Sequence, residues 1–214
     1  MSLAQIKSPS AQWQSHSINN VGLLEGETGS AFQLQTINGA QYKSWFAGVG
    51  LGLDFYRIRS IPLFADIRKE FGKGNNKLLV YADMGVNFSW ATDQQKTNYV
   101  QNDKFSNGFY TDLGLGYKVS AGKKNAVILS LGYSYKKSVE SYDQVYYDPG
   151  FIYTFTTQNN GTEKINYSLN RVTLKIGWEF EGRPLTEFIR EFRSGTILLG
   201  VEHGVNCRIP FLAY

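Results

Sequence analysis

The sequence predicts an all-β fold, an eight-stranded antiparallel barrel, on the strength of its composition and of its alternating pattern. The chain has 214 residues, a length that fits one domain. It carries 22 Gly, 14 Tyr, 14 Phe and 4 Trp against 5 Pro, a composition typical of closely spaced antiparallel strands. Apolar and polar residues alternate with period two in segment after segment, which is the signature of strands with two different faces.

Six segments alternate clearly. They span residues 45–56, 61–70, 78–90, 109–118, 127–136 and 171–180. Two weaker strands precede them at 18–24 and 30–37, joined by a turn-like stretch at 25–29. The total of eight is an even number, as single-chain bacterial membrane barrels require.

The connections between these strands differ in length at the two ends. Short turns are expected at 38–42, 72–76 and 120–124, and long loops at 91–104 and 139–167, with shorter links at 25–29 and 57–60. Short turns on one side and long loops on the other are typical of outer-membrane barrels. The pattern therefore predicts a transmembrane barrel whose first and last strands end on the short-turn, periplasmic side.

The two faces of the strands can be oriented physically, because an eight-stranded barrel is only just wide enough to be filled by side chains. The face rich in glycine also carries the charges, so we expect a structural ion-pair network in the lumen, made of Asp54, Asp66, Arg68, Glu70, Asp83, Asp112, Lys118, Lys136, Arg171, Lys175 and Glu179. Both signs are present and can pair there, whereas each basic residue facing lipid would cost roughly 2–4 kcal/mol. The apolar face would then meet lipid. A soluble, lipocalin-like periplasmic barrel would turn the faces the other way and is the alternative.

Aromatic residues on the apolar face fall near the strand ends. Towards the long loops lie Phe55, Phe88, Trp90, Phe109, Tyr133 and Tyr135, and towards the short turns lie Trp45, Phe71, Tyr117, Trp178 and Phe180. Two aromatic bands separated by aliphatic residues predict the interfacial girdles of a membrane barrel.

A family resemblance rests on two runs in the middle of the chain. Gly48-Val49-Gly50-Leu51-Gly52-Leu53-Asp54-Phe55-Tyr56, followed by Ile61-Pro62-Leu63-Phe64-Ala65-Asp66-Ile67-Arg68, resembles the Bacteroidetes-type outer-membrane barrel domain of OmpA/OmpX-like and PorT-like proteins. The resemblance covers roughly residues 17–180. It implies that Trp178 and Phe180, at the end of the last strand, form the signal read by the barrel-assembly machinery. It transfers no catalytic residue.

The two ends of the chain fall outside the expected barrel domain of residues 17–180. Residues 1–16 are expected to be a leader remnant or a disordered segment, because Ser2-Leu3-Ala4 looks like the end of a signal peptide but no apolar stretch precedes it. Residues 181–214 form an extension of uncertain status. Its Leu185, Phe188, Ile189 and Phe192 have helical spacing, which favours a short amphipathic helix.

Several function classes are disfavoured by the residues present. The net charge of +4 is scattered without a basic cluster, which argues against nucleic-acid binding. One cysteine, Cys207, permits neither an intrachain disulfide nor a cysteine metal site. The histidines are His16 and His203, each expected to be a solvated surface residue, so a nucleophile with a base in reach is not indicated. We therefore expect no enzyme activity, cofactor or metal.

Three functions remain as hypotheses. The leading one is a non-enzymatic barrel in the bacterial outer membrane, with a structural role or a role in binding through its loops. The candidate partner-binding residues, for an unknown protein or glycan, are Tyr142, Asp143, Tyr146, Tyr147, Asp148 and Tyr153. The soluble ligand-binding barrel is the second hypothesis, and an outer-membrane lipid-modifying enzyme using His16 is the third.

Overall fold

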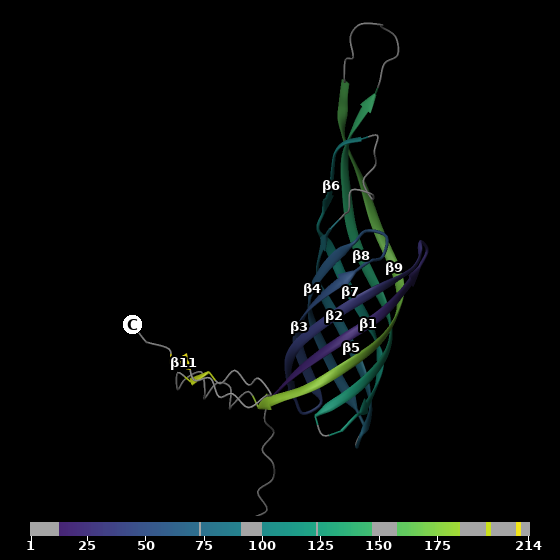
Figure 1. The fold of residues 1–214 in the computed structure, drawn as a ribbon. Coiled ribbons are helices and arrows are strands. Elements are labelled where there is room, and N and C mark those ends of the chain that lie inside the picture. The colour runs from purple at the N-terminus through teal and green to yellow at the C-terminus, as the bar shows by residue number, and fades with distance from the viewer. Residues whose placement is uncertain are drawn as a thin grey trace, which may run out of the picture.

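In a computed structural model, the chain forms an antiparallel β-barrel (Figure 1). The structure describes residues 13–72, 74–90, 100–122, 124–146, 158–184, 196–197 and 209–210. The strands are β1 (Gln14–Gly26), β2 (Gly29–Tyr42), β3 (Trp45–Asp54), β4 (Ser60–Phe71), β5 (Asn76–Ser89), β6 (Val100–Ser106), β7 (Gly108–Ser120), β8 (Asn125–Tyr146), β9 (Gln158–Pro184), β10 (Thr196–Ile197) and β11 (Ile209–Pro210).

Eight of these strands close the barrel. Each of β1 to β4 pairs with the next strand, β5 pairs with β7, β7 pairs with β8, and β8 pairs with β9. The closing seam joins β9 to β1 in antiparallel register, with Ser17 opposite Phe180 and Gly26 opposite Arg171. The predicted eight-stranded antiparallel fold is confirmed, and closure leaves the barrel wall without a free strand edge.

The outer wall is apolar, as the alternation predicts. Val172 and Ile176 are 52% and 61% exposed, while the alternate residues Arg171, Thr173 and Lys175 on the same strand are buried. A wall of this kind is a large exposed apolar surface that a water-soluble barrel would not carry. The orientation that distinguishes a membrane barrel from the soluble alternative is therefore the one observed.

The aromatic bands lie on this wall. At the short-turn end the Trp13 and Tyr42 rings stack with centroids 5.0 Å apart. In the same band Lys69 places its ammonium 4.6 Å from the Trp45 ring centroid, so a charge at the membrane interface is shielded by an aromatic face.

Tight turns connect the strands at the short-turn end. Strand β2 runs on to Tyr42, so the turn expected at 38–42 is instead formed by Lys43 and Ser44. Lys43 has φ 57°, a left-handed conformation that a non-glycine residue adopts at a cost. Arg57, in the link between β3 and β4, is the other non-glycine residue of the described chain with positive φ, at 52°.

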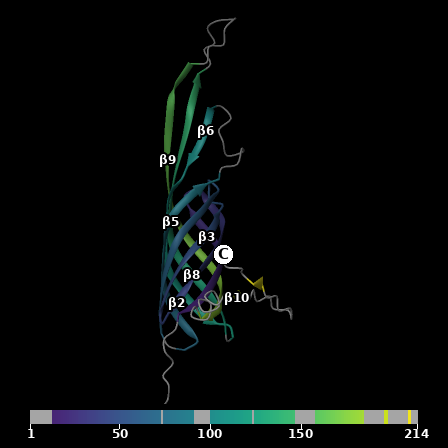
Figure 2. The same ribbon diagram turned by 90° about the vertical axis from the view of Figure 1, so that its left-hand side faces the viewer.

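The opposite end is more ordered than expected. Residues 139–167 were expected to form a loop, but 139–146 continue β8 and 158–167 belong to β9. The expected loop 91–104 likewise ends in β6, which pairs with β8 from Ser106 opposite Val139 to Val100 opposite Gln144. These prolonged strands rise above the barrel as a three-stranded sheet (Figures 1 and 2). We call this sheet, formed by β6, β8 from Val139 and β9 up to Tyr167, the apex.

Gly108 marks the point where the apex joins the wall. There β6 passes into β7, and both run along β8. A Cβ at Gly108 would overlap the backbone carbonyl of Lys137, so only glycine permits this close approach.

Beyond the barrel, β10 and β11 pair through two residues each. The helix expected around Leu185 to Phe192 lies outside the described residues, as do residues 1–12. Among the described residues, no helix is long and apolar enough to cross a membrane.

Candidate functional site: the lumen, its two mouths and the apex

The lumen is packed by aromatic rings that lie over glycines of other strands. A Cβ at Gly50 would overlap the Phe64 ring, and a Cβ at Gly132 would overlap the Tyr81 hydroxyl. The lumen is therefore closely packed where these rings cross it, because the glycines leave just the space that the rings occupy. Phe46, Phe64, Tyr81 and Tyr110 belong to one buried cluster with Ile18, Ile37, Leu79 and Ile128.

The structure places all eleven residues of the expected ion-pair network in the lumen, and each of them is buried. They form three layers along the barrel axis, which we call the outer, middle and inner layers according to their distance from the apex.

The outer layer is built around Asp54, which forms an ion pair with Arg171. Lys136 lies 3.1 Å from the other Asp54 oxygen and donates to the carbonyls of Tyr56 and Ile58 at 3.0 and 2.9 Å. The side chains of all three charged residues are 0% exposed. The single negative charge of Asp54 is shared by two cations. The carbonyl groups of Tyr56 and Ile58, in the β3–β4 link, therefore supply the additional stabilisation that the Lys136 ammonium needs.

The middle layer holds three carboxylates side by side on β4, β5 and β7. Asp66 lies opposite Asp83, and Asp83 lies opposite Asp112. Asp66 binds Arg68 at 2.8 Å and Asp112 binds Lys175 at 2.8 Å. Asp83 lies 3.8 Å from Lys175 Nζ, and neither of its oxygens has a hydrogen-bond donor among the described residues.

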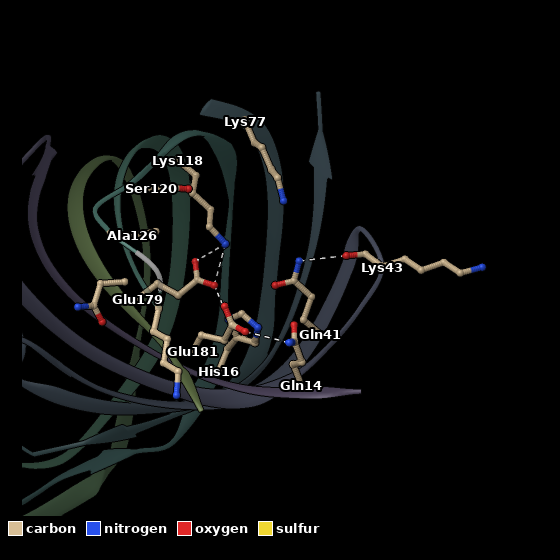
Figure 3. A pocket seen from close by; sticks show the side chains of 13 residues that line it. Gln14, His16, Gln41, Lys43, Lys77, Lys118, Ser120, Ala126, Glu179 and Glu181 are labelled. Atoms are coloured by element: carbon tan, nitrogen blue, oxygen red, sulfur yellow. Dashed lines mark hydrogen bonds and ion pairs between the residues drawn. The ribbon is translucent and has the colours of Figure 1, made fainter. Parts of the chain in front are cut away.

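The inner layer lies at the mouth on the short-turn end of the barrel (Figure 3). Lys118 is 2.7 Å from Glu70 and 2.8 Å from Glu179, Lys77 is 2.6 Å from Glu70, and His16 Nδ1 is 2.5 Å from Glu179. A cavity of about 230 Å³ adjoins these pairs, and its lining includes Lys77, Lys118, His16 and Glu179 together with Gln14, Gln41 and Glu181.

The position of His16 corrects one expectation. It was expected to be a solvated residue ahead of the first strand, but it lies on β1 and is 7% exposed. The inward face of β1 carries it beside Glu179, across the closing seam. Sequence reasoning also missed Lys77 and the polar partners Gln33 and Gln35, whose amides donate to the Tyr110 hydroxyl at 3.0 and 2.9 Å. His203 and Cys207 lie outside the described residues.

The chemistry available in the lumen is that of ion pairing. Most of its carboxylates already have a cationic partner in contact, and the described residues contain no group of three or more His, Cys, Asp or Glu arranged to hold a metal ion. The geometry is suited to holding the wall together.

The apex contains the described part of the expected partner-binding loop. Tyr142 and Asp143 lie on β8, and the Tyr142 hydroxyl donates to Glu163 at 3.1 Å across the hairpin. Tyr146 ends β8, whereas Tyr147, Asp148 and Tyr153 lie outside the described residues. Lower down, Tyr167 donates to Glu140 at 2.5 Å. Partial burial and this hydrogen bond raise the pKa of the Tyr167 hydroxyl, which keeps it protonated as a donor at neutral pH.

The fold defines the class of protein. The chain has the architecture of the small outer-membrane β-barrels, because an even number of strands closes around a charged lumen and presents an apolar wall. It is similar in structure to the outer membrane protein OprG from Pseudomonas aeruginosa, with a TM-score of 0.53 over 80% of this chain and 96% of that one. At 9% identity the likeness concerns the fold alone.

Two further solved structures are similar over much of the chain. Neisserial surface protein A matches with a TM-score of 0.47 and 11% identity, covering 78% of this chain and 96% of its own. The outer membrane protein AlkL, determined in lipid bilayers, matches with a TM-score of 0.47 and 9% identity, covering 86% and 97%. No protein-family model matches the sequence, and the search of curated proteins finds no match.

Proposed function

We propose that this chain is a non-enzymatic barrel of the bacterial outer membrane that presents its apex to a partner at the cell surface. The observation that carries the proposal is the difference between a lumen filled with paired side chains and strands that continue far beyond it. Such strands serve no purpose in crossing the membrane, since about 9–11 tilted residues suffice for that, whereas β8 has 22 residues and β9 has 27.

The apex is suited to presentation because it is a sheet with supporting contacts. The Ser89 hydroxyl lies 2.6 Å from the Ser138 hydroxyl and donates to the Ser106 carbonyl at 3.2 Å, which ties β5 to β8 and to β6. Strands β6 and β9 form its two edges, since each pairs there with β8. Exposed strand edges offer backbone donors and acceptors to a binding partner.

Three finer assignments belong to the same proposal. The resemblance to Bacteroidetes-type barrels of the OmpA/OmpX-like and PorT-like kind supports membership of that group. Trp178 and Phe180, on the lipid-facing side of β9, are proposed as the signal for the barrel-assembly machinery. Outer-membrane lipid is the proposed surrounding of the apolar wall.

The test is protease treatment of intact cells that express the chain. Cleavage within residues 139–163, with the barrel strands protected, is the expected result, because the apex would lie outside the cell. A matched variant replaces residues 139–166 by a short Asn-Gly turn, which joins Ser138 and the opposite Tyr167 with minimal length. It should still migrate on gels as a heat-modifiable barrel and should resist the protease.

Two results would refute the proposal. One is an apex that becomes cleavable only after the outer membrane is opened. The other is stable ion conductance of the purified protein in planar bilayers, because it would mean that the lumen is a pore.

A further inference from the structure

A small niche lies where the apex meets the barrel rim. It has a volume of about 130 Å³. We call it the rim niche; its lining residues are Glu27, Thr28, Tyr56, Arg57 and residues 166–170. They come from the β1–β2 turn, from the link between β3 and β4, and from β9.

One side of the niche is a strand edge. The seam between β9 and β1 ends where Gly26 lies opposite Arg171, and above this point β9 is paired with β8 on its other side. The backbone of residues 166–170 therefore turns peptide groups towards the niche, and such groups favour a hydrogen-bonding occupant.

Arg57 and Tyr167 form a second, preorganised side. The Arg57 guanidinium lies 4.8 Å from the centroid of the Tyr167 ring, and the Tyr167 hydroxyl is held by Glu140. The backbone of Arg57 has φ 52°, a left-handed conformation that glycine would adopt without cost.

The size and charge of the niche indicate the chemical class of its occupant. At roughly 10–15 Å³ of free space for each water, the niche holds on the order of ten non-hydrogen atoms, about the size of one sugar ring and far less than a drug-sized ligand needs. One cation, Arg57, is matched by one anion, Glu27, so the niche does not select a charged ligand. The rest of the polar lining is neutral and offers both donors and acceptors, which suits a neutral polyhydroxylated ring; it includes Thr28, Asn166, Tyr167, Ser168 and Asn170.

We propose that the rim niche binds a single sugar ring of a surface saccharide, either in the head group of an outer-leaflet glycolipid or at the end of a free glycan. The inference rests on the proposed function, since it places the niche on the outer surface, and it gives the partner a chemical class.

The experiment uses the full chain in phospholipid nanodiscs and two probes. One probe is an array of neutral oligosaccharides, and the other is lipopolysaccharide incorporated in the nanodisc and detected by native mass spectrometry. Binding in either arm supports the proposal, and the arm that responds identifies the source of the sugar. No binding in both arms overturns it.

Arg57→Gly is the decisive variant, because it removes the guanidinium while relieving the backbone. We expect saccharide binding at least tenfold weaker and thermal stability equal to or above that of the wild type. Lys43→Gly is the matched control, since Lys43 has φ 57° at the opposite end of the barrel, and its binding should be unchanged.

Equal loss of binding in both variants, or full binding by Arg57→Gly, would overturn the assignment to the rim niche. These outcomes are separate from those of the proposed function, because cell-surface exposure of residues 139–163 is measured without any saccharide. If the apex is exposed at the cell surface but the niche binds no saccharide, this inference is refuted and the proposed function is not affected.

Discussion

The outer and inner layers of the lumen contain the same kinds of ion pair in different surroundings. In the outer layer Asp54, Lys136 and Arg171 are fully enclosed. In the inner layer Glu70, Lys77 and Glu179 line or adjoin an open cavity, and the Lys77 side chain is 31% exposed. Desolvation makes an enclosed charge dependent on its partner, whereas water substitutes for a lost partner at an open mouth. The two ends of one lumen should therefore respond very differently to the same kind of substitution.

The largest effect is expected for Arg171→Met. The change leaves Asp54 with Lys136 as its remaining cation, and it removes the donor to Ser134 at 2.7 Å. Breaking an enclosed pair costs about 3–5 kcal/mol, so the free energy of unfolding in urea should fall by that amount, as measured by tryptophan fluorescence in detergent micelles. Lys118→Met, at the mouth, is the comparison, and an equal loss there would contradict the distinction between the layers.

Gly132→Ala should have the next largest effect, because the new methyl group would overlap the Tyr81 hydroxyl and approach the Leu113 carbonyl at 2.7 Å. Overpacking of this kind costs about 1–3 kcal/mol. The double variant with Tyr81→Phe should recover part of the loss in the same urea titration. Additive losses would show that the ring does not depend on the glycine.

Asp83→Asn should act in the opposite direction. An amide can donate to the Asp66 or Asp112 carboxylate opposite it, whereas the carboxylate of Asp83 has no donor in the described structure. We expect the free energy of unfolding to rise by about 1 kcal/mol. Asp112→Asn is the matched control and should lower it, because Lys175 would lose the carboxylate that lies 2.8 Å away.

Lys77→Ala should have the smallest effect. Its pair with Glu70 is partly solvated, and Lys118 stays in contact with the same carboxylate. A loss of about 0.5 kcal/mol is expected, shrinking further in high salt because exposed pairs are screened. A loss comparable to that of Arg171→Met would mean that the mouth is as closed as the outer layer.

The sequence was informative where the membrane imposes a pattern. In the segment from Trp45 to Tyr56 every second residue faces lipid. The period-two alternation alone therefore predicts correctly which residues lie in the lumen and which lie on the outer wall. Strand β1 was harder, because Ile18 and Leu24 point inward while Asn19 points outward. The polarity of its faces is partly inverted, which concealed both the start of the strand and the place of His16.

The sequence was least informative where the membrane ends. The sequences of residues 139–146 and 158–167 mix polar residues with a few apolar ones such as Val139 and Ile165, so they lack the regular apolar alternation by which strands are recognised. The partners within the lumen were equally hidden, since Asp54 and Arg171 are 117 positions apart. Composition predicts that such charges pair, but strand register decides which ones do.

The closing seam brings Gln14 opposite Pro184, so the first and last strands of the barrel end next to each other. A short linker between these two residues would allow new ends to be opened in another turn at the same end of the barrel, such as the one between β7 and β8. In that circular permutant Trp178 and Phe180 would no longer stand on the final strand, although every wall contact would be kept. The permutant's insertion into membranes by the assembly machinery can be compared with its unaided refolding in detergent. A loss of insertion with unchanged refolding would show that the position of Trp178 and Phe180 matters for recognition by the machinery and not for folding of the barrel.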